Sequence, residues 1–158
     1  MDRYKAVVIL LVEDDAADQK LTRQSLCANR IGNDLRAVAS GEEALEYLQR
    51  SKQNEPDSPM PDLILLDLNM PGMGGKELLK ALKEDPVLGA IPVVILTTSD
   101  SDRDVLDSFH LQAAGYIRKP GSLEGFQEVM RDLTDYWFVI CRRVEHSRSA
   151  GKVEMSVS

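Results

Sequence analysis

The sequence predicts an α/β protein in which a mostly parallel, five-stranded sheet carries helices on both faces. Short apolar runs rich in β-branched residues recur along the chain, and each ends at turn-forming residues, which is typical of strands buried on both faces. Segments with helical apolar spacing separate these runs. Such alternation predicts right-handed βαβ units and therefore a parallel sheet.

The strands are predicted from apolar runs of different strength. The clearest run is 62–67, in which four apolar residues lead into Asp67 before Pro71 and Gly72 break the chain. Residues 33–39 are weakly apolar and predict a short edge strand. The predicted strands are 6–12, 33–39, 62–67, 91–96 and 115–118. Five strands with an acidic first turn favour the flavodoxin-like order 2-1-3-4-5.

The helices are predicted from capping residues and spacing. Asp15 is placed to cap a helix over 16–29, and Ser40 to Glu43 form a capping box before a second helix. A third helix covers 76–84 and is stopped by Pro86. A fourth begins near Asp100, and a fifth runs from 122 to about 143. We therefore expect one domain over residues 1–143 and a disordered tail over 144–158.

Composition excludes several classes of function. The net charge of −7 argues against non-specific binding to nucleic acid or to an anionic membrane surface. No apolar run approaches membrane-spanning length, and neither a G-x-G-x-x-G turn after the first strand nor a Walker loop is present. Cys27 and Cys141 have no metal-type spacing and favour thiols in a reducing cytosol, so we expect a cytoplasmic protein.

Polar residues follow the predicted strands at one edge of the sheet. Glu13 and Asp14 follow the first strand, Asp67 ends the third, Thr97 follows the fourth and Lys119 follows the fifth. Taken singly, each is better explained as a turn former, a cap or a solvated charge. Considered together, carboxylates this close to one another are unfavourable unless a cation lies among them, and their oxygen ligands suit Mg²⁺. A nucleophilic carboxylate, a metal, a lysine and a hydroxyl describe phosphoryl transfer to a carboxylate.

Four motifs in combination resemble the receiver domain of bacterial two-component response regulators. They are Val-Glu-Asp-Asp at 12–15, Leu-Asp-Leu-Asn-Met-Pro at 66–71, Leu-Thr-Thr at 96–98 and Gly-Tyr-Ile-Arg-Lys-Pro at 115–120. The resemblance covers about residues 6–142. A departure is Gly121, where many receivers have a bulkier residue after Lys-Pro.

The resemblance implies a role for each matching residue. Asp67 would accept a phosphoryl group from a sensor kinase histidine, and Thr97 and Lys119 would contact the phosphoryl oxygens. Tyr116 would act with Thr97 as an aromatic switch. The implied Mg²⁺ ligands are the carboxylates of Asp14 and Asp67, the backbone carbonyl of Asn69 and, through water, Glu13.

The C-terminal part of the sequence indicates which kind of response regulator the chain resembles. No output domain fits after Arg143, so we expect a single-domain regulator that only phosphorylates and slowly dephosphorylates itself. The chain looks similar to the short regulators that partner phytochromes. The last predicted helix is apolar on every side near its end, which favours a homodimer through the fourth helix, fifth strand and fifth helix. The residues assigned to this interface are Tyr136, Trp137, Phe138 and Val139.

Three alternatives are open at this point. The aromatic residues could fold back on their own domain instead of forming a dimer. A phosphohydrolase similar to the haloacid dehalogenase class would need an aspartate two residues after its nucleophile, where this chain has Asn69. A degenerate receiver serving as a constitutive dimerisation module would not need the complete set of acceptor-site residues found here.

Overall fold

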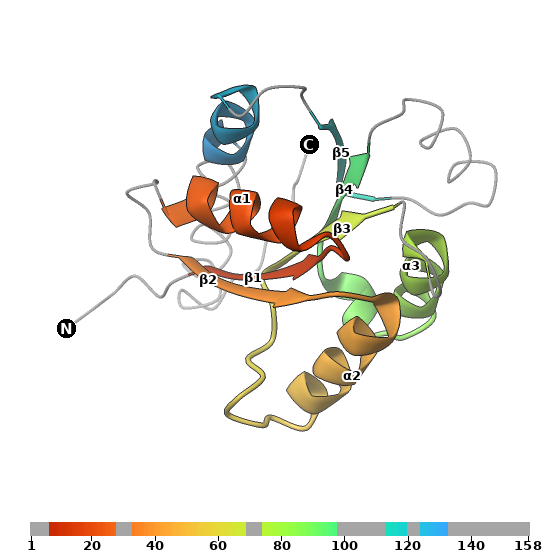
Figure 1. Ribbon diagram of the computed structural model, residues 1–158. Helices are drawn as coiled ribbons and strands as arrows, with labels where there is room; N and C mark the ends of the chain where they lie inside the picture. Colours follow the sequence, from red (N-terminus) through yellow and green to blue (C-terminus); the bar gives the residue numbers. More distant parts are fainter. Residues whose placement is uncertain (1–6, 28–32, 69–73, 98–112, 120–123, 133–158) are drawn as a thin grey trace, which may run out of the picture.

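The computed structural model describes residues 7–27, 33–68, 74–97, 113–119 and 124–132 (Figure 1). Within them, five parallel strands form one sheet in the order β2-β1-β3-β4-β5, which confirms the predicted class and strand order. The strands are β1 (Val7–Val12), β2 (Asn33–Val38), β3 (Leu63–Asp67), β4 (Val93–Thr97) and β5 (Gly115–Arg118). The weakly apolar β2 lies at an edge of the sheet, as its composition predicts.

Helices cover both faces of the sheet. The helical elements are α1 (Ala16–Cys27), α2 (Gly41–Lys52), α3 (Gly75–Lys83), the short 3₁₀ helix η1 (Leu88–Ala90) and residues 124–132. Figure 1 shows α1 and residues 124–132 on one face, and α2 and α3 on the other. The fourth predicted helix and the remainder of the fifth lie outside the described residues.

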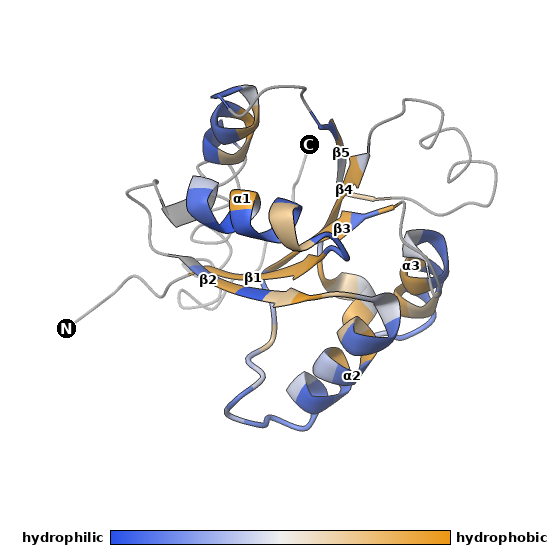
Figure 2. Cartoon of the chain, in the orientation of Figure 1, coloured by the Kyte–Doolittle hydropathy of each residue, from blue (hydrophilic) through white to orange (hydrophobic). Residues whose placement is uncertain are grey.

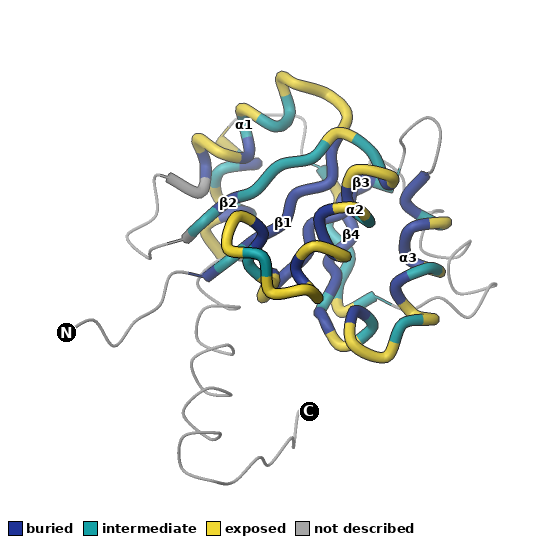
Figure 3. Tube along the Cα trace, turned by 90° about the horizontal axis from the view of Figure 1, so that it is seen from below, coloured by how far each residue is buried: buried dark blue, intermediate teal, exposed yellow. Residues whose placement is uncertain are grey.

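The alternation of side chains along the strands divides the core into two layers. Leu10 and Val12 of β1 pack in a cluster with α2 and α3, whereas Ile9 and Leu11 pack in a cluster with Phe126 on the opposite face. The strands β3 and β4 are therefore apolar up to their last residues, Asp67 and Thr97 (Figure 2), and buried throughout (Figure 3). This burial explains why their sequences run continuously apolar instead of alternating.

The start of α2 is capped as its sequence predicts. Ser40 Oγ accepts a hydrogen bond of 3.1 Å from the backbone N–H of Glu43. The Glu43 carboxylate in turn accepts from the backbone N–H of Ala39 at 3.0 Å, one residue earlier than in the usual capping box. The helix therefore begins at Gly41, directly after β2 and its short turn.

The boundaries of the later elements differ slightly from the predicted ones. The strand β4 starts at Val93, two residues later than predicted, because Ile91 directly follows the 3₁₀ turn and donates its backbone N–H back to Leu88 at 3.1 Å. It extends to Thr97, which the sequence placed just beyond the strand. Among the described residues, no helix is both long enough and apolar enough to cross a bilayer.

Candidate functional site

Three carboxylates meet at the carboxyl edge of the sheet. Glu13 and Asp14 directly follow β1, and Asp67 is the last residue of the adjacent strand β3. One carboxylate oxygen from each lies within 4.8 Å of those of the other two. Glu13 and Asp67 are buried, at 1% and 6% exposure, whereas Asp14 is exposed. The site therefore has two buried acids and an opening to solvent beside them.

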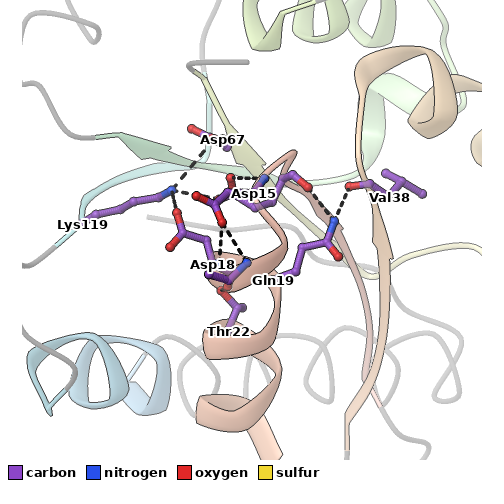
Figure 4. Close-up of polar contacts among 9 residues, drawn as sticks. Asp15, Asp18, Gln19, Thr22, Val38, Asp67 and Lys119 are labelled. Carbon is purple, nitrogen blue, oxygen red and sulfur yellow. Dashed lines mark hydrogen bonds and ion pairs between the residues drawn. The ribbon is translucent and has the colours of Figure 1, made fainter. Parts of the chain in front are cut away.

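Lys119 reaches this carboxylate cluster from the end of β5. Its backbone N–H donates a hydrogen bond of 2.8 Å to the carbonyl of Thr97, which fixes the residue beside the end of β4. Its Nζ lies 2.9 Å from Glu13 Oε1, 3.3 Å from Asp18 Oδ2 and 3.9 Å from Asp67 Oδ2 (Figure 4). One ammonium thus contacts three carboxylates from three different elements.

Burial and neighbouring charge perturb the two central groups in opposite ways. Burial, the hydrogen bond to Asp67 and the charge of Asp67 raise the pKa of Glu13 to about 7, although Lys119 opposes the rise. Burial alone would lower the pKa of Lys119. The hydrogen bond to Glu13 and the charges of Asp67, Glu13 and Asp18 outweigh burial and raise the pKa above its usual value. Near neutral pH, the lysine is therefore charged and Glu13 is poised between its two forms.

The turn between β1 and α1 is held by side chains around Glu13. Asp15 Oδ1 accepts from the backbone N–H groups of Ala17 and Asp18 at 2.8 Å and 3.3 Å, so Asp15 caps α1 as predicted. The backbone N–H of Asp15 donates to Glu13 Oε2 at 3.3 Å. Gln19 Nε2 donates to the carbonyl of Glu13 at 2.6 Å and to that of Val38 at 3.3 Å, which joins the ends of β1 and β2 (Figure 4).

The donor atoms of this cluster fit a hard divalent cation. Like charges placed this close are unfavourable unless a cation or a proton lies among them. Lys119 supplies one positive charge, which leaves the three carboxylates of Glu13, Asp14 and Asp67 incompletely neutralised. Their ligands are all oxygen atoms and one side of the site is open, a combination that suits Mg²⁺ with several of its waters retained. The residues present therefore fit the metal that the sequence predicts.

The other predicted site residues lie around this cluster or outside the described residues. Thr97 is the buried last residue of β4, the strand that neighbours β3. Tyr116 is half-buried on β5 and packs against the core cluster beneath α2 and α3. The residues that fall outside the described part of the chain are Asn69, Tyr136, Trp137, Phe138 and Val139.

Sequence reasoning missed two residues that contact the site. Asp18, which forms an ion pair with Lys119, lies in the first turn of α1, and nothing in the sequence indicated this partner 101 positions away. Gln19 had no clue either, because its two acceptors are backbone carbonyls at positions 13 and 38. Asp18 and Gln19 come close to these partners only once the sheet and the first helix have packed together.

Comparisons with known proteins agree on one family. The family model of the response regulator receiver domain matches residues 9–131. Response regulator Rcp1 of Synechocystis sp. is 39% identical over 130 residues, which cover 82% of this chain and 88% of Rcp1. The crystal structure of the phosphorylated cyanobacterial phytochrome response regulator RcpA matches with a TM-score of 0.74 at 36% identity, covering 84% of this chain and 94% of RcpA. The Mn²⁺-bound form of Rcp1 matches with a TM-score of 0.73 at 38% identity, with the same coverage.

Proposed function

Because this chain belongs to the response regulator receiver family, we propose that it is a regulator that receives a phosphoryl group on Asp67 from a sensor histidine kinase. The observation that supports this role most directly is the position of Lys119. Its ammonium lies 3.9 Å from Asp67 Oδ2 while it is hydrogen-bonded to Glu13, so a positive charge stands beside the acceptor before any phosphoryl group arrives.

The transfer requires little of the protein beyond position and charge. A carboxylate oxygen of Asp67 attacks the phosphorus of the donor phosphohistidine. The new O–P bond forms as the N–P bond breaks, and the electron pair stays on the imidazole nitrogen, which then takes up a proton. Lys119 donates to a phosphoryl oxygen, and the Thr97 hydroxyl donates to another.

We propose Mg²⁺ as the cofactor, with the carboxylates of Asp14 and Asp67 as its side-chain ligands and Glu13 acting through water. Their converging oxygens support this choice, as does the Mn²⁺ bound in the similar structure of Rcp1. A bound Mg²⁺ would supply positive charge that stabilises the negative charge of the transferring phosphoryl group. The backbone carbonyl of Asn69, proposed as a further ligand from the sequence motif, lies outside the described residues.

The proposed output is a two-state switch. Thr97 moves toward the phosphoryl group, and Tyr116 turns into the space that Thr97 leaves. The half-buried position of Tyr116 at the edge of the core supports this role, because a small change in packing there alters the surface around β5. Signalling then proceeds through protein contacts in the cytoplasm, without nucleic acid or membrane binding.

The proposed partners are a kinase and a second copy of this chain. The similarity to RcpA, a cyanobacterial phytochrome response regulator, supports a phytochrome-type histidine kinase as the donor. The homodimer rests on the apolar sequence at Tyr136, Trp137, Phe138 and Val139. Sedimentation with and without Mg²⁺ and beryllofluoride tests the dimer. We expect association to strengthen with beryllofluoride and to be lost in Phe138→Glu; a monomer under every condition would contradict the proposed interface.

Phosphorylation itself is tested with acetyl phosphate and Mg²⁺ on a gel that retards phosphoproteins. We expect one shifted band in the wild type, at no more than one phosphate per chain, and none in Asp67→Asn. Asp57→Asn is a matched control, because Asp57 is an exposed carboxylate in the loop before β3. An unchanged shift in Asp67→Asn would refute Asp67 as the acceptor, and repeated turnover of phosphate esters would identify a phosphohydrolase instead.

A further inference from the structure

We propose that Asp18 is a positioning residue that holds the Lys119 ammonium toward α1 and away from Asp67 in the unphosphorylated protein. The proposal rests on the function proposed above, and it concerns the balance between the two states of that site. Asp18 Oδ2 lies 3.3 Å from Lys119 Nζ, closer than Asp67 Oδ2 at 3.9 Å. Asp18 therefore accepts a hydrogen bond from the lysine, whereas Asp67 lies beyond hydrogen-bond distance and attracts the lysine through its charge.

The position of Asp18 is well defined by the start of α1. Its backbone N–H donates to the cap Asp15 at 3.3 Å, and its carbonyl accepts from the Thr22 hydroxyl at 2.9 Å. Figure 4 shows its carboxylate pointing from the first turn of the helix toward Lys119. Because the backbone is held by these two bonds, replacing the carboxylate by an amide leaves the helix cap intact.

The hydrogen bonds of Lys119 explain how Asp18 can influence the reaction. An ammonium has three N–H donors, and two of them are directed at Glu13 and Asp18. The 3.9 Å separation from Asp67 is too long for a hydrogen bond. A phosphoryl oxygen on Asp67 that draws the ammonium closer therefore competes with these two existing contacts.

Of the two hydrogen bonds that the Lys119 ammonium donates to Glu13 and Asp18, the one to Asp18 breaks more readily. It is longer than the bond to Glu13, and the Asp18 side chain is 40% exposed whereas that of Glu13 is 2% exposed. Water can hydrate the Asp18 carboxylate once the lysine leaves, which is not so for Glu13. The contact thus stabilises the unphosphorylated arrangement by the modest amount typical of a half-exposed ion pair. Loss of the Asp18 charge shifts the site toward the phosphorylated arrangement.

The test measures the binding of beryllofluoride, which mimics the phosphoryl group on Asp67, by calorimetry at a fixed Mg²⁺ concentration. We expect Asp18→Asn to bind beryllofluoride about two- to fivefold more tightly than the wild type, the size of effect of a half-exposed ion pair. Asp18→Glu keeps the charge and should stay near wild-type affinity. Glu46→Gln removes one exposed negative charge from α2 and controls for net charge.

A double-mutant cycle shows whether Asp18 acts through Lys119. In a Lys119→Met background, which binds more weakly overall, Asp18→Asn should change the affinity for beryllofluoride no more than Glu46→Gln does. An equal gain in that background, or no gain over Glu46→Gln in the wild-type background, would overturn the positioning role. Failure of the proposed function would look different, because the wild type itself would then neither bind beryllofluoride nor accept phosphate. That result would also refute the role of Asp18.

Discussion

Lys119 Nζ and Glu13 Oε1 lie 2.9 Å apart although 106 positions separate the two residues in the chain. Their contact joins the end of β5 to the end of β1 across the two intervening strands, β3 and β4. Both side chains are largely withdrawn from solvent, at 15% and 2% exposure. Glu13 and Lys119 therefore interact only when the whole sheet is assembled. The pH dependence of the free energy of unfolding follows from this contact.

Without Mg²⁺, the free energy of unfolding should fall as pH rises from about 4.5 to 7. The folded pKa of Glu13 is about 7, above its ordinary value of 4.5, so the folded protein binds more protons than the unfolded chain in this window. The raised pKa of Lys119 contributes stability at every pH below its ordinary value of 10.5 and adds no slope here. Urea unfolding at several pH values measures the slope.

Glu13→Gln should remove this pH dependence, because glutamine resembles the protonated acid in shape and charge. As the pH rises from 4.5 to 8, the wild type should lose stability while the variant does not. The unfolding free energy of the variant relative to that of the wild type should therefore increase by on the order of 3 kcal/mol. Glu46→Gln, which removes an exposed carboxylate, is the control and should parallel the wild type. Parallel curves for Glu13→Gln and wild type would mean that Glu13 titrates normally.

Mg²⁺ should stabilise the folded protein, and chelation by EDTA should reverse the effect. At a concentration one hundred times the dissociation constant, one bound ion raises the free energy of unfolding by about 2.7 kcal/mol. Thermal unfolding followed by circular dichroism measures this change. The effect should be larger at pH 8 than at pH 6, because Mg²⁺ displaces the proton from Glu13. Asp14→Asn should reduce it, whereas the exposed control Asp57→Asn should not.

Gln19→Ala should destabilise the backbone that carries Glu13 and thereby weaken Mg²⁺ binding. Its side chain joins the carbonyls of Glu13 and Val38, and its loss leaves two acceptors at the ends of β1 and β2 without this donor. We expect a loss of about 1–2 kcal/mol in unfolding free energy and a weaker affinity for Mg²⁺. Gln24→Ala changes an exposed glutamine of the same helix and is the matched control. Equal stability and metal affinity of the two variants would show that the bridge has no effect on the site.

The sequence predicted the order of the strands and the acidic edge of the sheet, because both follow from local patterns. Asp67 was identifiable from the apolar run before it, and Ser40 from the glutamate three positions later. Asp18 was not, because its partner lies 101 positions away and is chosen by side-chain direction. The two-residue error at the start of β4 has a local cause, since the apolar Ile91 closes the preceding 3₁₀ turn instead of beginning the strand.

Gly75→Ala should disturb the acceptor through its backbone. A Cβ atom at this first residue of α3 would lie 2.8 Å from Leu68 Cα and 3.0 Å from the carbonyl oxygen of Asp67. Both are backbone atoms, so relief requires α3 or the end of β3 to move. We expect a loss of about 1–3 kcal/mol in unfolding free energy, although alanine favours the helix itself. Phosphorylation by acetyl phosphate should also slow, because Asp67 shifts relative to Lys119.

Gly115→Ala is the matched control for this steric effect. A Cβ atom at Gly115 would meet Val94 Cγ2 at 3.7 Å, an ordinary contact, so this substitution should leave stability within about 1 kcal/mol of the wild type. Denaturant unfolding and the phosphorylation rate are measured on both variants. Normal stability and rate in Gly75→Ala would show that the junction of β3 and α3 can relax without moving Asp67. A slow rate with normal stability would instead locate the effect at the acceptor alone.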